Sequence, residues 1–230
     1  MNKRLQQVQI NSAIELYSKG RIQEALDTVE TLTKDYPNEA LLYNISGVCF
    51  RAIDRLDDAV SSFTKALAIQ PDYTEVYNNL GITLKELGQL DEAVNSYKKA
   101  LSIKPDYAEA HNSFGVALDE LGQMDDAIKS YKKALTLKPD YAEAHNNIGI
   151  TFREVGQIDD AIKSFEKALV CKPDYAIAHR NLSALKRYTV NDAQIAQMQS
   201  LLSTGKLSKP ERIHLSLIHI SEPTRPRLIS

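Results

Sequence analysis

Small and apolar residues recur along the chain in two stripes with helical spacing. In the stretch 74–86 they lie three or four residues apart, at Tyr77, Leu80, Gly81 and Leu84. A second stretch repeats the spacing at Leu90, Ala93, Tyr97 and Ala100. Intervals of three and four residues place side chains on one face of an α-helix. The pattern therefore predicts two successive amphipathic helices, each with one buried face.

The segments between these predicted helices carry turn signals. Gly88 follows the first stripe and can end its helix, while Asp91 and Glu92 suit the positive N-terminal end of the second. The motif Lys-Pro-Asp-Tyr then breaks the second helix. Its aspartate is predicted to cap the helix that follows, and it occurs as Asp72, Asp106, Asp140 and Asp174.

The two-helix pattern returns with a period of 34 residues, marked by Pro37, Pro71, Pro105, Pro139 and Pro173. A fixed period of this size indicates a stacked array of helical hairpins. The predicted units are 40–73, 74–107, 108–141 and 142–175, with a divergent unit at 6–39 and a covering helix at 176–188. Below, a position in the repeat is counted from the first residue of its unit.

Small residues recur at fixed positions of both helices. Glycine stands on the first helix, and alanine on the second, at Gly81, Gly115, Gly149, Ala93, Ala127 and Ala161. A glycine inside a helix costs about 0.5–1 kcal/mol relative to alanine, so close packing has to offset that cost. We therefore expect the backbones of the two helices in each unit to approach closely.

The full set of recurring residues resembles the tetratricopeptide repeat. Tyr or His stands at position 4, Gly at 8, Ala at 20, Tyr or Phe at 24, Ala at 27 and Pro at 32, over roughly residues 6–188. The resemblance implies an all-α fold, a right-handed α-solenoid of helix-turn-helix repeats. It also implies that the first helices line a concave groove that receives a peptide or a segment of another protein.

Asparagines recur on the first helices. If positions 4, 7, 8 and 11 are buried, helical geometry predicts that positions 2, 5, 9, 12 and 13 lie on the opposite side. Positions 5 and 6 carry Asn44, Asn78, Asn79, Asn112, Asn146, Asn147 and Asn181, and Arg180 continues the position-5 row. A row of amides can bind an extended peptide backbone without reading its sequence. The row also resembles those of O-linked N-acetylglucosamine transferases. Alternatively, these amides solvate a helix face and bond neighbouring repeats, and both interpretations stay open.

Charged residues complete the predicted groove. Glu75, Glu109 and Glu143 stand at position 2, and Lys85 and Arg153 at position 12. Tetratricopeptide domains that capture a carboxylate end carry lysine and arginine at positions 2, 5 and 6. Because this chain has glutamate and asparagine there, we do not expect that specificity. Lys85 and Arg153 join the asparagines as candidate groove residues.

Composition narrows the classes of partner. Charged residues form 25% of the 230 residues and give a net charge of −2, which argues against a grip on nucleic acid. No apolar stretch approaches the roughly 18 residues that span a membrane, and the N-terminus does not resemble a signal peptide. Two cysteines, Cys49 and Cys171, are too few for a disulfide scaffold. We expect a cytoplasmic protein that binds protein or extended peptide.

No catalytic or cofactor-binding motif stands out. A phosphate-binding loop, a dinucleotide fingerprint, Cys-x-x-Cys and His-Glu-x-x-His are all missing from the sequence. His111, His145 and His179 fall on successive first helices, whose packed neighbours lie about 8–10 Å apart, so they cannot share one metal ion. We therefore predict a non-catalytic module with no cofactor and no metal.

The end of the chain departs from the repeat. Residues 189–214 predict helical segments, one over "NDAQIAQMQSLL" and another opening near Ser208, where Glu211 completes a capping-box spacing. The stretch 181–214 resembles the junction in bacterial proteins where such repeats precede a sulfotransferase domain, although that family's donor-binding loop is missing here. As an alternative function, the chain is then the repeat part of a sulfotransferase; a repeat-bearing glycosyltransferase is a weaker alternative. Residues 215–230 resemble the conceptual translation of a transposon-end sequencing adapter, so we expect a fragment with a non-native tail.

Overall fold

The computed structural model describes residues 3–186, 193–203, 208 and 215, and within them the chain folds into helices and turns with no β-strand. The all-α fold class expected from the sequence is therefore confirmed. The chain divides into two compact units, Met1–Gly122 and Gln123–Ser230.

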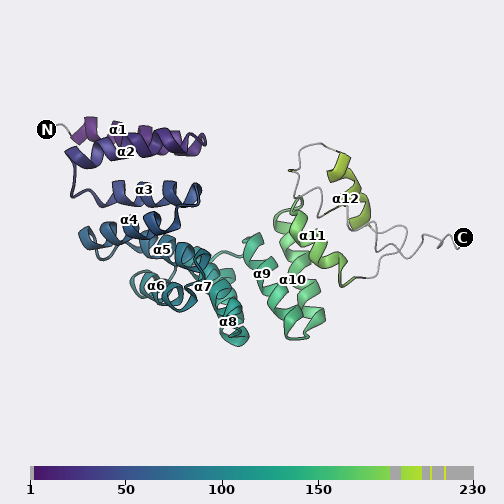
Figure 1. Ribbon diagram of the computed structural model, residues 1–230. Coiled ribbons are helices and arrows are strands. Elements are labelled where there is room, and N and C mark those ends of the chain that lie inside the picture. Colours follow the sequence, from purple (N-terminus) through teal and green to yellow (C-terminus); the bar gives the residue numbers. More distant parts are fainter. Residues whose placement is uncertain (1–2, 187–192, 204–207, 209–214, 216–230) are drawn as a thin grey trace, which may run out of the picture. The chain divides into compact units, whose positions relative to one another are not determined.

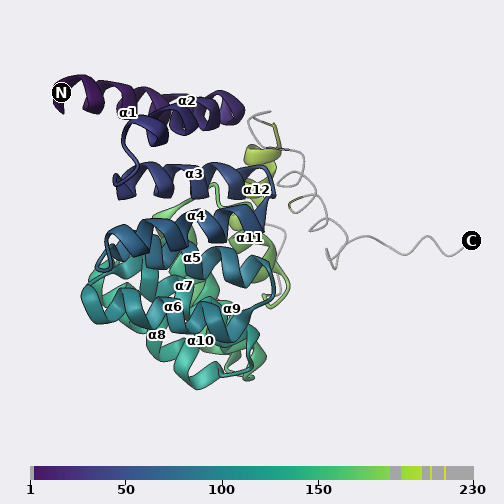
Figure 2. The same cartoon turned by 60° about the vertical axis from the view of Figure 1, so that its left-hand side comes forward.

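The first unit consists of successive helical hairpins (Figures 1 and 2). Its helices are α1 (Lys3–Ser18), α2 (Ile22–Asp35), α3 (Ala40–Ala52), α4 (Leu56–Ile69), α5 (Thr74–Glu86), α6 (Leu90–Ile103) and α7 (Ala108–Glu120). Each helix packs against the next, and the first helices of neighbouring repeats also touch, α3 against α5 and α5 against α7. This arrangement surrounds each first helix with protein on several sides.

The second unit continues the same alternation. Its helices are α8 (Met124–Leu137), α9 (Ala142–Glu154), α10 (Ile158–Cys171), α11 (Ala176–Ser183) and α12 (Ala193–Ser203). The helix predicted over "NDAQIAQMQSLL" is α12. Met198 on α12 and Leu215 are buried together with Ala176 at the start of α11, and Gln197 Nε2 donates to the Pro173 carbonyl over 3.2 Å. The helix predicted to open near Ser208 and the tail 216–230 lie outside the described residues.

The turns agree with the sequence-based prediction at the glycine that ends the first helix and differ from it at the predicted aspartate caps. Gly88 has φ +76°, in the left-handed region that ends a helix, and the equivalent residue of the preceding repeat is Asp54 with φ +60°. The predicted aspartate caps are wrong. The first helices of the later repeats begin instead after Tyr73, Tyr107, Tyr141 and Tyr175, without a side-chain cap. Each aspartate therefore stands one residue too early to cap.

The small residues at position 8 make room for a ring rather than for a backbone. A Cβ on Gly81 would lie 2.7 Å from the Tyr97 ring, and one on Gly149 would lie 2.7 Å from the Phe165 ring. Separations this short are closer than packing tolerates. Position 8 has to be small because the aromatic residue at position 24 of the same repeat presses against its helix.

Candidate functional site

Asparagine side chains join neighbouring first helices. Asn79 Nδ2 on α5 donates to Asn44 Oδ1 on α3 over 3.1 Å. Asn181 Nδ2 on α11 donates to Asn146 Oδ1 on α9 over 3.0 Å. In both cases a position-6 amide donates to the position-5 amide of the preceding repeat. We call this arrangement an amide pair.

Three of the amides at position 5 lie inside the protein, which corrects the expectation that these side chains face away from the core, whereas Asn44 at the same position is half-buried. Asn78 is 6% exposed, Asn112 8% and Asn146 2%, and Asn181 at position 6 is 3% exposed. The reason is that first helices such as α5 and α9 contact their own second helices and also helices of neighbouring repeats. Helical periodicity within one repeat reveals only the first of these contacts.

One amide pair is incomplete. Among the described residues, no donor reaches the buried Asn78 Oδ1. The residue at position 6 of the next repeat is Ser113, where the two observed pairs have Asn79 and Asn181. Because serine lacks the amide that donates in those pairs, the Asn78 acceptor is left without its counterpart.

Charged residues occupy the more exposed strip of the first helices. Lys85 Nζ on α5 lies 3.3 Å from Glu120 Oε1 on α7, and Arg153 on α9 lies 4.0 Å from its neighbour Glu154. The position-2 glutamates Glu75, Glu109 and Glu143 are exposed. Positions 2 and 13 thus carry exposed charges and position 12 is half-buried, whereas Asn78, Asn112 and Asn146 at position 5 are buried.

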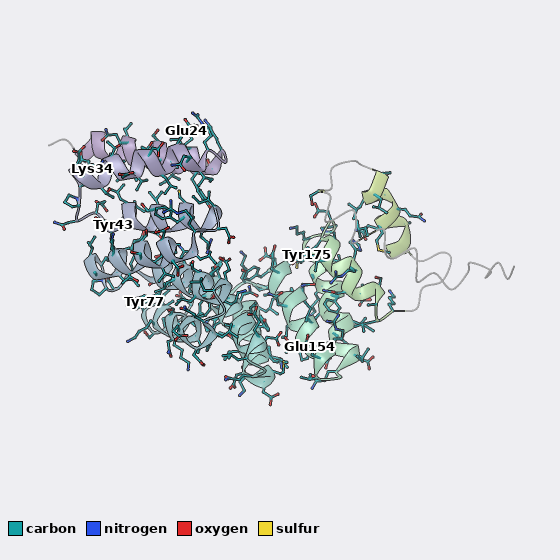
Figure 3. The ribbon with its side chains drawn as sticks, viewed as in Figure 1. Glu24, Lys34, Tyr43, Tyr77, Glu154 and Tyr175 are labelled. Carbon is teal, nitrogen blue, oxygen red and sulfur yellow. The ribbon has the colours of Figure 1, made fainter. Side chains whose placement is uncertain are left out.

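On α3, α7, α9 and α11 the side chain at position 4 forms a hydrogen bond with the loop that precedes the helix. The Nε2 atoms of His111, His145 and His179 lie 3.0, 2.9 and 2.8 Å from the carbonyl oxygens of Pro105, Pro139 and Pro173. Tyr43 makes the same contact, its hydroxyl donating to the Pro37 carbonyl over 3.1 Å. Figure 3 labels Tyr43 and Tyr77 at this position of α3 and α5.

Burial shifts the pKa values of two of these histidines and of Cys49. It lowers the pKa of His145 and of His179, and the proline carbonyls only partly oppose the effect. Burial also raises the pKa of the Cys49 thiol to about 11. In the part of the chain that the structure describes, no three His, Cys, Asp or Glu side chains are grouped to hold a metal ion. The histidines therefore serve as hydrogen-bonding groups that fix a loop to a helix.

The fold gives the class of the protein, and the comparison with family models gives its family. Stacked helical hairpins with amide pairs and position-4 contacts define a helical-repeat protein. Models described as tetratricopeptide repeat or TPR repeat match residues 10–74, 62–95, 83–122, 117–154 and 142–175. The chain belongs to the tetratricopeptide-repeat family. A search of curated proteins found no match.

Solved structures share the fold. The thermophilic TPR protein TTC0263 of Thermus thermophilus is 26% identical, with a TM-score of 0.66 over 78% of this chain and 98% of that one. "YrrB: a TPR protein with an unusual peptide-binding site" is 25% identical, with a TM-score of 0.59 over 74% and 88%. "PilW, widely conserved type IV pilus biogenesis factor" is 22% identical, with a TM-score of 0.76 over 95% and 100%. The last likeness shows the fold alone.

The length and hydropathy of the helices also bear on membrane insertion. None of those in the described ranges is both long and apolar enough to cross a bilayer.

Proposed function

We propose that the chain is a non-catalytic scaffold that binds a protein or an extended peptide along the groove of its first helices. The observation that carries the proposal is a strip of charged side chains on the first helices, exposed at positions 2 and 13 and half-buried at position 12, which the core does not cover completely. Similarity to a repeat protein with a peptide-binding site supports it. The expected cytoplasmic location belongs to the same proposal.

Within this proposal the candidate residues divide by exposure. Asn44, Asn79, Lys85, Asn147 and Arg153 are half-buried and can present part of their side chains to a ligand. The four more deeply buried amides act indirectly, by holding neighbouring first helices in register, and they are Asn78, Asn112, Asn146 and Asn181. We leave the sulfotransferase and glycosyltransferase alternatives out of the proposal because neither the matched family models nor the structural neighbours above support them.

A peptide-selection experiment tests the assignment of this face. An immobilised chain is offered a fluorescent library of random extended peptides, and retained peptides are titrated against Lys85→Glu and Arg153→Glu. Reversing a charge that contacts ligand is expected to lower affinity about tenfold, or 1.4 kcal/mol. The matched control is Lys133→Glu, which is exposed and lies on the second helix α8.

Two results would contradict the proposal. One is equal retention of the selected peptides by the wild type and both first-helix variants. The other is a loss of binding in the Lys133→Glu control alone, which would move the ligand to the second helices.

A further inference from the structure

A second concave surface lies in the second unit, on second helices rather than along the first. A cavity of about 630 Å³ is lined by residues of α8 and α10 together with His145 of α9. Its walls include Leu135 and Val170, and Lys132 and Lys167 contribute cations. It therefore combines apolar surface with positive charge, which is the composition of a binding pocket for a ligand of mixed character.

Val170 is the feature that distinguishes this cavity. It is 81% exposed, although single apolar residues on a surface are ordinary. The same position of the repeat holds Ala68, Ser102 and Thr136 in the units 40–73, 74–107 and 108–141. A large apolar side chain thus stands beside the two lysines of this cavity, at a position where those units have small or polar residues.

The lysines of the cavity lack the ion pairs that their neighbours make. On the same two helices, Lys129 pairs with Asp126 over 2.7 Å and Lys163 with Asp160 over 3.5 Å. Across the described part of the chain, no carboxylate lies within ion-pair distance of Lys132 or Lys167. Lys132 Nζ lies 5.9 Å from the centre of the Phe152 ring instead. The positive charge of the cavity is therefore not neutralised from within.

The first unit offers a natural control. A cavity of about 450 Å³ beside α6 is lined by Tyr77, Ser102, Lys98 and Lys99, with two further polar residues. It has the lysines but a serine where the second unit has Val170. Both cavities thus contain lysines, but only the cavity of the second unit has Val170 as an exposed apolar wall.

We propose that the cavity of the second unit is a docking site for an acidic, amphipathic segment of a partner protein. A carboxylate of the segment lies between Lys132 and Lys167, and an apolar side chain packs on Val170 and Leu135. Charge complementarity selects the carboxylate, and the removal of Val170 from water favours the apolar neighbour. This surface is separate from the groove of the first helices, so the two proposals stand or fall independently.

Cys171 lines the same cavity and supplies a local readout. It is exposed, whereas Cys49 is buried, so N-ethylmaleimide should alkylate Cys171 alone in the folded protein. The probe is a synthetic helical peptide with glutamate and leucine on one face. We expect it to slow alkylation of Cys171 in the full chain, with half-protection at a concentration that rises with salt.

Matched variants separate the two parts of the site. Val170→Ser and the double change Lys132→Gln/Lys167→Gln should each raise the half-protection concentration about tenfold. Lys98→Gln/Lys99→Gln, in the other cavity, should leave it unchanged. Because all five side chains line surface cavities, a thermal melt of each variant should match the wild type.

Four results would overturn the proposal. They are no protection of Cys171 at millimolar probe, equal protection by a glutamate–serine peptide, equal protection by a lysine–leucine peptide, and displacement of the probe by inorganic phosphate. The last would identify a small-anion site. A fifth overturning result is dimerisation that by itself protects Cys171, which would assign the surface to a second copy of the chain.

Discussion

Helix α5 is joined to α3 by an amide hydrogen bond and to α7 by an ion pair, although α3 and α7 are equivalent first helices of neighbouring repeats. Towards α3, Asn79 donates to Asn44 over 3.1 Å. Towards α7, the corresponding acceptor on Asn78 meets no donor among the described residues, and the bond is the Lys85–Glu120 ion pair of 3.3 Å. Similar repeats thus hold together by different contacts.

The two interfaces differ in the opposite sense at the positions of the Lys85–Glu120 ion pair, because in the described part of the chain the α3/α5 interface lacks that ion pair. The residues equivalent to Lys85 and Glu120 on α3 and α5 are Arg51 and Glu86. Within the described residues Arg51 Nη1 is buried without a hydrogen-bond partner, and no ion pair joins it to Glu86. Each interface therefore makes one of the two contacts that the repeat allows. A neutral hydrogen bond contributes about 0.5–1.5 kcal/mol and an exposed ion pair about 0.2–1, so the α3/α5 side is expected to be the stronger.

Asn146→Ala should have the largest effect because it breaks a complete and buried amide pair. The change leaves Asn181 Nδ2 without its acceptor in a place that water does not reach, at a cost of about 2–3 kcal/mol. Urea unfolding followed by circular dichroism measures the loss. The matched control is Asn78→Ala, which removes an acceptor already without a donor and should cost about 1 kcal/mol or less. Equal losses would show that the amide pairs do not stabilise the repeats.

Ser113→Asn should complete the missing pair and stabilise the first unit. The new amide would stand where Asn79 and Asn181 stand in the complete pairs and could donate to Asn78 Oδ1, for a gain of about 1 kcal/mol. The measurement is the urea midpoint of the full chain, compared with that of the same change in an Asn78→Ala background. A gain that survives without Asn78 would mean that the hydrogen bond is not its cause.

The amide pairs also show which features of the structure the sequence predicts and which it does not. The period of 34 residues predicted the helices well: α3, α5, α7 and α9 begin at Ala40, Thr74, Ala108 and Ala142, the first residues of the predicted units. Periodicity assigned position 5 to the wrong environment because a single repeat does not show its neighbours. A spacing of 35 residues between Asn44 and Asn79 was the available signal, since it joins adjacent positions of consecutive units.

Other features depended on contacts that no short motif encodes. Tyrosine rather than aspartate precedes the first helices, and lysine lies over its ring, with Lys104 Nζ 5.2 Å from the centre of Tyr107. The packing of Met198 against Ala176 likewise joins segments that the 34-residue rhythm does not relate. The cavity beside Val170 needed the folded positions of three helices.

Acidification extends the comparison from position 5 to position 4 and should give the smallest effect. Burial lowers the pKa of His145 and His179 in the folded second unit, whereas in the first unit Tyr43 and Tyr77 fill this position on α3 and α5 and His111 fills it on α7. The unfolded chain therefore binds more protons than the folded one below the unfolded histidine pKa of about 6.5. The free energy of unfolding should be constant above that pH and fall as the pH decreases through it. The loss is small because Nε2–H donates to the proline carbonyl in both protonation states.

Urea midpoints across this range, compared with those of His145→Tyr/His179→Tyr, measure the effect. If the double variant loses stability on acidification as steeply as the wild type, the histidines are not responsible.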